Sequence, residues 1–283
     1  MALTFHSFKF LQKLQEEVKS MGNVLSVGRM NNLILNDDFK KLSLKKYEDT
    51  YADNILLDNF TISSIESLDY SDFEGANIIH DLNLPIIKLG EKFDTILDFG
   101  TSEHIFNIIQ NFKNISHLCK INGHILHCLP TNNNCGHGFW QFSPELFLNL
   151  YQNKNGFDET LIYLVNLHDN ENWYEINKQN VGERLELNSS EPLYIFVKTK
   201  KIGKISFDNI HQSDYEFHWQ KKEGAQNKNK SRLSLVNKRV KDTIKKFLRN
   251  NIVSKNYFRK IEDIKNHNKK NFKKNKNLKK IKI

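Results

Sequence analysis

Apolar and polar residues are grouped along the first 200 residues in a way that predicts a layered α/β sheet. Apolar residues recur at helical spacing between several short apolar runs, for example at Ile105, Ile108, Phe112 and Ile115. The short runs themselves end at turn residues and predict strands at 23–28, 61–71, 76–83, 93–99, 124–130, 157–169 and 192–200. Strands that alternate with helices favour a mostly parallel sheet with right-handed crossovers.

The first 22 residues predict a helix that packs on this sheet. One side of the helix is apolar, at Phe5, Phe8, Leu11, Leu14 and Val18. The segment lacks a small-residue cleavage site and carries two early glutamates, so it is a poor signal peptide. No apolar run approaches the roughly 18 residues of a membrane-spanning helix. We therefore expect a packing helix over 1–22 and a sheet domain over 23–203.

Charge separates an acidic body from a basic C-terminal extension. The net charge is +9, but residues 201–283 hold 25 Lys and Arg against 7 Asp and Glu. Within the extension at 204–283, an apolar stripe flanked by basic residues predicts an amphipathic helix at about 231–250, and the Lys- and Asn-rich end favours disorder or a frayed helix. The extension fits a membrane surface or another anionic partner, or else a solvated tail with no single partner. No nucleic-acid-binding module is recognisable.

The cysteines indicate a reducing compartment and no metal site. Cys119, Cys128 and Cys135 show no disulfide-framework spacing, so we expect a cytoplasmic protein. His127 and His137 lie near two of these cysteines, but neighbours on a strand point to opposite faces of a sheet. Since CxxC and HExxH motifs are also absent from the sequence, we expect no metal.

A glycine or an aspartate lies at or near the ends of the first four strands expected in the sheet. These residues are Gly28, Asp69, Asp81 and Asp98. In open α/β sheets this edge binds ligands, and a carboxylate after the second strand accepts from the ribose of a nucleotide. The competing interpretation of each aspartate is a helix cap or a turn. Four such residues at one edge favour a nucleotide-type site.

Five segments resemble, in order, the class I S-adenosylmethionine-dependent methyltransferases. The resemblance covers about residues 20–200, and its most distinctive part is an "EH" pair after strand four with a "GHGFWQFSPE" block after strand five. It implies a three-layer, Rossmann-like α/β fold with a seven-stranded, mostly parallel sheet whose last strand is antiparallel. S-adenosylmethionine would then lie across the ends of strands one to four. The segments are "VLSVG", "LDYSDFEGANIIHDLN", "FDTILDFGTSEHIFN", "INGHILHCLP" and "GHGFWQFSPELF".

The same resemblance assigns cofactor-binding roles to individual residues. Gly28 would lie beneath the amino-acid part of the cofactor, and Asp69 would bind the ribose. The adenine would be contacted by Tyr70, Asp81 and Leu82, and the methionine moiety by Asp98 and Gly100.

The loop after the first strand departs from the family pattern. In place of G-x-G-x-G it reads "GRMNN", which weakens or abolishes cofactor binding unless Arg29 pairs with the cofactor carboxylate. The same loop excludes a Rossmann dehydrogenase, which needs G-x-G-x-x-G at this point.

Residues after strands four and five are candidates for the acceptor side of the site. A hydroxyl acceptor needs a base, and His104 or His137 suits that role, with Glu103 orienting a histidine or binding the acceptor. The competing interpretation of His104 is a residue that bonds backbone at a helix start. The remaining candidates are substrate-binding: Asn132, Asn133 and Trp140.

The sequence therefore predicts an S-adenosylmethionine-dependent methyltransferase for oxygen or nitrogen of a small polar acceptor. A sugar or surface-glycan precursor is the acceptor that the resemblance implies, and with it a role in polysaccharide biosynthesis. The alternative is a non-catalytic, methyltransferase-like module that acts through its basic extension on a membrane surface or nucleic acid.

Overall fold

The computed structural model describes residues 1–177, 185, 187, 189–208, 210–217, 219 and 277–283. These fall into two units, and the larger comprises residues 1–176, 190–210 and 279–283. The smaller unit comprises residues 177–189 and 211–278. The amphipathic helix expected at about 231–250 lies outside the described residues. The fold and the candidate site belong to the larger unit.

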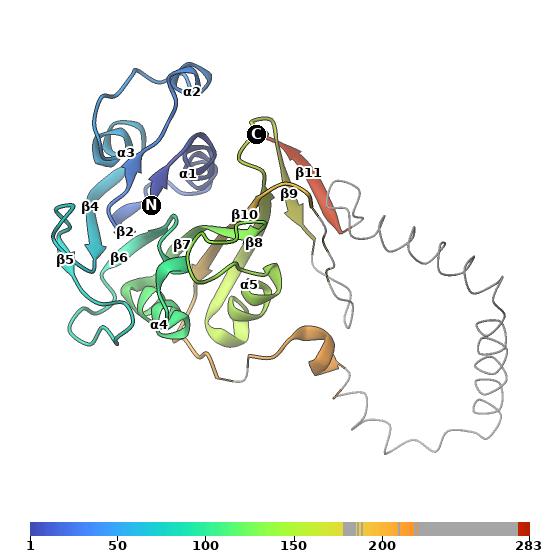
Figure 1. Cartoon of the computed structure of the whole chain (residues 1–283). Helices are drawn as coiled ribbons and strands as arrows, with labels where there is room; N and C mark the ends of the chain where they lie inside the picture. Colours follow the sequence, from blue (N-terminus) through green and yellow to red (C-terminus); the bar gives the residue numbers. More distant parts are fainter. Residues whose placement is uncertain (178–184, 186, 188, 209, 218, 220–276) are drawn as a thin grey trace, which may run out of the picture. The chain divides into compact units, whose positions relative to one another are not determined.

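A mixed sheet with a parallel core forms the centre of this unit (Figure 1), as the alternation of strands and helices predicts. The strands lie in the order β11-β9-β8-β10-β7-β6-β2-β4-β5. Neighbours from β5 to β7 pair parallel, whereas β10 is antiparallel to both β7 and β8. The strands are β2 (Gly22–Val27), β4 (Ile62–Asp69), β5 (Ile78–Ile79), β6 (Phe93–Asp98), β7 (Cys119–Asn132), β8 (Phe157–Val165), β9 (Asn172–Ile176), β10 (Leu193–Lys201) and β11 (Leu278–Lys282).

Two strands at one edge of the sheet were not predicted. β9 follows β8, and β11 adds the last residues of the chain to the same edge. The expectation that strands end near residue 203, and that the Lys-rich end is disordered or a frayed helix, is therefore wrong for 278–282. Lysines hid the strand from sequence reasoning, although they are common on edge strands because they discourage pairing with other chains.

Helices lie on both faces of the sheet. Their bounds are α1 (Phe5–Glu17), α2 (Asn36–Lys41), α3 (Asp53–Asn59), α4 (Ile108–Leu118) and α5 (Pro144–Leu150), with 3₁₀ turns η1 (Ser102–His104) and η2 (Asn153–Asn155). Leu126 and Cys128 of β7 join a core that also contains α1 and α3. His127, between them, contacts Phe112 of α4 and Phe147 of α5. Successive strand residues point to opposite faces, so α1 and α3 cover one face and α4 and α5 the other.

The N-terminal helix forms as its sequence predicts. Thr4 caps α1 through a capping box with Ser7, and the apolar stripe is buried in the core. Within that core the Nε1–H of Trp173 donates to Nδ1 of His6 over 2.9 Å. Before α1, a short strand β1 (Ala2–Leu3) pairs parallel with β3 (Asn31–Asn32).

A lysine is buried on the face of the sheet that α4 and α5 cover. The Nζ of Lys201 donates to the carbonyl oxygens of Ser116 and Cys119 and to the carboxylate of Glu91, at 2.7–3.0 Å. These three acceptors replace the water that the ammonium group loses on burial.

Among the described residues, no helix combines the length and the apolar character needed to cross a membrane.

Candidate functional site

The carboxyl ends of β2, β4, β6 and β7 meet at one edge of the sheet and bring most of the predicted site residues there. After β2 the chain continues to β4 on one side of β2, whereas β6 and β7 lie on the other side of β2 in the sheet. This reversal of strand order opens a crevice in parallel α/β sheets, and ligands bind in it.

Gly28 and Asp69 lie side by side at this edge. Gly28 has φ +84°, and a methyl group added to it would lie 3.8 Å from Oδ2 of Asp69 and only 2.7 Å from Oγ1 of Thr101. A glycine is therefore required here, because the backbone is left-handed and no side chain fits. Tyr70 follows Asp69 and is 74% exposed. The structure therefore brings Gly28 and Asp69 together, and the cofactor-binding roles of the three residues stay predictions.

The space above Gly28 holds the side chain of Met1. Its sulfur accepts from Oγ1 of Thr101 over 3.1 Å and would lie 3.0 Å from a methyl group on Gly28. The Cα of Met1 would lie 3.6 Å from one on Gly100. Backbone bonds hold the segment, since Ala2 donates to the carbonyl of Phe99. A methionine side chain thus occupies the place that the resemblance gives to the methionine part of the cofactor.

Arg29 does not point toward a cofactor carboxylate. Its guanidinium donates to the carbonyl oxygens of Glu74 and Gly75, pairs with Asp53 at 3.2 Å and lies over the ring of Tyr51. These contacts, made by both terminal nitrogens, join the loop after β4 to α3. The expectation that Arg29 replaces the missing glycines is therefore not supported.

Asp81 and Leu82 form the turn after β5. Oδ1 of Asp81 accepts from both the backbone and the side chain of Asn83, and these bonds lower the pKa of Asp81. Leu82 is buried, and its carbonyl accepts from Asn114 of α4. The contacts of Asp81 are those of the turn interpretation.

Asp98 lies beneath the site instead of facing it. Its carboxylate is fully buried and accepts from the backbone and hydroxyl of Ser102 and from Nδ1 of His127 at 2.7 Å. Nε2 of His127 in turn lies 2.6 Å from the hydroxyl of Tyr151. These contacts engage both oxygens of Asp98 in supporting η1, and its role toward a cofactor stays a prediction.

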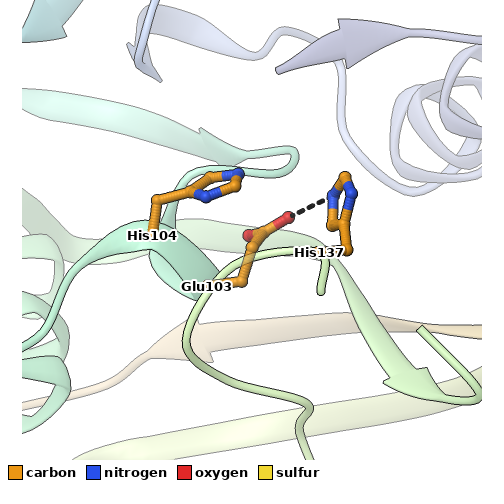
Figure 2. Close-up of side chains that lie close together, drawn as sticks. All are labelled: Glu103, His104 and His137. Atoms are coloured by element: carbon orange, nitrogen blue, oxygen red, sulfur yellow. Dashed lines mark ion pairs between the residues drawn. The ribbon is translucent and has the colours of Figure 1, made fainter. Parts of the chain in front are cut away.

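Glu103, His104 and His137 converge above this support (Figure 2). Their candidate ligand atoms all lie within 4.8 Å of one another. Oε1 of Glu103 and Nε2 of His137 are 3.4 Å apart, and the rings of His104 and His137 have centroids 5.5 Å apart. The two histidines are exposed, whereas Glu103 is fully buried. The structure thus brings together all three residues predicted for the acceptor side.

Gly138 allows the loop of His137 to reach Glu103. It has φ +82°, and a methyl group on it would lie 2.6 Å from the carbonyl oxygen of Glu103. The same carbonyl accepts from the backbone of Phe139 at 2.7 Å. Nε1 of Trp140 donates to the carbonyl of Ile105 over 2.9 Å. These bonds fix the loop after β7 to the turn after β6, and so fix the three side chains relative to one another.

Burial makes Glu103 an unusual carboxyl group. Neither of its oxygens has a hydrogen-bond partner among the described residues, because Nε2 of His137 is not aligned for such a bond. Burial, and then the charge of Asp98, raise the pKa of Glu103 to about 8. Lost hydration and the neighbouring His137 lower the pKa of His104. Burial therefore disfavours the charged forms of both Glu103 and His104.

Tyr194 of β10 belongs to this site and was missed. Its ring lies 6.4 Å from that of His137, and burial followed by the charge of Glu103 raises the pKa of Tyr194. Phe106 and Phe139 follow His104 and His137 by two residues each, are both largely exposed and meet edge to face. The strand pattern around residue 194 carries no signal of a site, because the contact joins segments nearly 60 residues apart.

The asparagines expected to bind substrate also hold the loop after β7, Asn133 through its side chain and Asn132 through its backbone carbonyl. The side chain of Asn133 donates to the carbonyl of Glu191, and the carbonyl of Asn132 accepts from Asn134. Trp140 lies beside Ile105 and covers the turn after β6. The backbone N–H of Trp140 also donates to the carbonyl of Glu103 over 3.3 Å.

Comparison with known proteins finds similarity only at the level of solved structures. No protein-family model matches the sequence, and neither does any curated protein. One similar structure is the N-methyltransferase NodS from Bradyrhizobium japonicum in complex with S-adenosyl-L-homocysteine (10% identity, 70% of this chain, 87% of that chain, TM-score 0.38). Others are an S-adenosylmethionine-dependent methyltransferase from Thermotoga maritima (16%, 70%, 91%, 0.32) and the YcgJ protein from Bacillus subtilis (9%, 70%, 99%, 0.38). The structural neighbours include class I S-adenosylmethionine-dependent methyltransferases, all at low sequence identity.

Proposed function

We propose that this protein is a class I S-adenosylmethionine-dependent methyltransferase that acts on oxygen or nitrogen of a small polar acceptor. The observation that carries the proposal is the position of two groups of residues on one sheet edge. Gly28 and Asp69 follow β2 and β4, while Glu103, His104 and His137 follow β6 and β7. The first group suits a nucleoside cofactor and the second a polar acceptor.

The residues at β2 and β4 fit the cofactor in two respects. A nucleoside ribose requires an acceptor such as the carboxylate of Asp69, and close approach requires a residue without a side chain at Gly28. When bound, the cofactor supplies an electrophilic methyl group on its sulfonium. The side chain of Met1 covers Gly28, so we infer that the segment before α1 moves when the cofactor binds.

The acceptor side contributes alignment and proton transfer. Methyl transfer needs the nucleophile held in line and kept from water, which the fixed loops of Glu103 and His137 suit. His104, with its lowered pKa, is neutral at pH 7 and accepts the proton that a hydroxyl acceptor loses. The exposed rings of Phe106 and Phe139 provide an apolar surface next to these polar groups, as a sugar ring would require.

Two observations favour a second candidate, a methyltransferase-like binding module without cofactor. Met1 fills the place of the cofactor methionine, and Arg29 is engaged by Asp53 and two carbonyl oxygens. A chain that has lost cofactor binding tolerates both features. The two candidates differ in whether the full-length protein binds S-adenosylhomocysteine.

Calorimetric titration of the full-length protein with S-adenosylhomocysteine tests the proposal. Asp69→Ala should weaken binding by about 1.5–3 kcal/mol, the range for a hydrogen bond to a charged group. Asp72→Ala, in the exposed part of the same loop, is the matched control and should bind as the wild type does. Hydrogen exchange at Ala2 and Asn31 should speed up in the complex, because their bonds hold the Met1 segment. Absence of binding to the wild type would favour the binding module, and unchanged binding by Asp69→Ala would remove its ribose role.

A further inference from the structure

The cluster of Glu103, His104 and His137 has the donor set of a metal centre. Two imidazoles and one carboxylate bind Zn²⁺ in catalytic sites that leave a coordination position open for water or substrate. The same set binds other first-row metals, whereas Ca²⁺ and Mg²⁺ prefer oxygen ligands alone. The three side chains come from two loops that backbone hydrogen bonds join.

The spacing of the donor atoms also suits a metal. Oε1 of Glu103 and Nε2 of His137 are 3.4 Å apart without hydrogen-bond alignment. Two ligands on a tetrahedral metal with bonds of about 2.1 Å are separated by about 3.4 Å, so this pair already has the required spacing. All three donors lie within 4.8 Å, so His104 completes the set by a shift on the order of 1 Å, which a side-chain rotation provides.

The burial of Glu103 is a second, independent observation. Its side chain is fully buried, and neither carboxylate oxygen has a hydrogen-bond partner among the described residues. Native proteins satisfy nearly all buried polar groups, and an exception calls for an ion or a water. The two histidines on the outer side are exposed, so an ion can enter from solvent. The unpartnered oxygens therefore mark the inner side of a binding site.

We propose that Glu103, His104 and His137 bind one divalent first-row transition-metal ion, with Zn²⁺ as the best match. The open position of this ion would face the exposed side of the cluster, next to Phe106 and Phe139. Its function in catalysis rests on the proposed methyl transfer: a hydroxyl bound to the ion would be acidified and release its proton to water, so His104 would serve as a ligand when the ion is bound and as the base only in its absence. Metal binding itself does not depend on that activity.

This proposal differs from the expectation of no metal drawn from the sequence. That expectation rested on His127 and Cys128, which indeed face opposite sides of β7. The donors proposed here come instead from the turn after β6 and the loop after β7, and no short motif contains them all.

Metal titration of the full-length protein, after removal of bound metal by a chelator, tests the site. Zn²⁺ is measured by calorimetry, and Co²⁺ by the visible absorption that reports its coordination. We expect one high-affinity ion per chain. Glu103→Gln, His104→Gln and His137→Gln should each weaken binding at least tenfold. His117→Gln, an exposed histidine on α4, is the matched control and should have no effect. Cys135→Ser should also leave binding unchanged, because the proposed ligands do not include this nearby exposed thiol.

Three outcomes would overturn the proposal: no ion bound by the wild type, unchanged affinity in the three ligand variants, or loss of binding in Cys135→Ser. Far-ultraviolet circular dichroism of each variant shows whether it is folded, and the glutamine replacements keep the shape of the side chains. S-adenosylhomocysteine titration of the same proteins separates this proposal from the proposed function. A protein that binds metal but no S-adenosylhomocysteine refutes only the methyltransferase, and the reverse refutes only the metal site.

Discussion

Replacing Gly138 by alanine tests whether close approach of two loops builds the site. The left-handed backbone at Gly138 costs an alanine about 1–2 kcal/mol. The new methyl group would also lie 2.6 Å from the carbonyl oxygen of Glu103 and 3.0 Å from its carbonyl carbon. Backbone atoms cannot rotate away, so the loop must retreat and lose the hydrogen bond from Phe139 to that carbonyl, worth about 0.5–1.5 kcal/mol. The expected destabilisation is therefore about 1.5–3.5 kcal/mol.

Gly136 provides a matched control in the same loop. Its φ of +84° nearly equals the +82° of Gly138, but no atom lies within 4 Å of the methyl group that alanine would add. Gly136→Ala should therefore cost only the backbone term of about 1–2 kcal/mol. Urea unfolding of the two full-length variants gives the difference directly. Equal destabilisation of the Gly138→Ala and Gly136→Ala proteins would refute the close approach. Binding of Zn²⁺ by that Gly138→Ala protein with the affinity of the wild type would refute it as well.

Two further predictions concern stability away from the site. Burial lowers the pKa of His6 below 6.5, so the folded protein resists its protonation and should lose stability as the pH falls below about 6.5. His6→Asn keeps an acceptor for Trp173 and should reduce this loss in urea unfolding at pH 7.5 and 5.5; an unchanged loss would assign it to other groups. Lys201→Met should cost about 2–4 kcal/mol, because two buried carbonyl oxygens lose their donor. Lys200→Met, whose partner Glu159 is exposed, should cost under about 1 kcal/mol, and equal costs would contradict this account.

Local sequence patterns account for much of the sheet. β2 and β6 were readable because each is a short, largely apolar run that ends at a turn residue, and β4 because its spaced apolar residues end at Asp69. The strand expected over 76–83 shortens to Ile78–Ile79, because Asp81 and Asn83 bond each other in a turn. Two strands were missed, β9 with its Asn, Trp, Tyr and Glu, and the Lys-rich β11. Whether such segments form strands depends on pairing with a neighbouring strand.

The candidate site could be predicted from the sequence only for residues that follow a strand, because the end of the strand then fixes where they lie. Glu103, His104 and His137 follow parallel neighbours, so the sequence order alone predicts that they meet. The contacts of Met1 and Arg29 instead link residues 24 to 100 positions apart. Such contacts depend on packing between elements, and no periodicity or short motif in the sequence encodes them.

The edge strand β11 changes what the basic extension is. The extension was expected to be a tail attached at one end. Its first residues follow β10, but its last residues form β11, which lies beside β9 in the same sheet (Figure 1). The extension therefore starts from one strand of the sheet, β10, and ends in another, β11. Removing it removes an edge strand of the sheet as well as a tail. Cutting the chain near residue 203 would leave β9 as an unprotected edge, open to pairing with another chain.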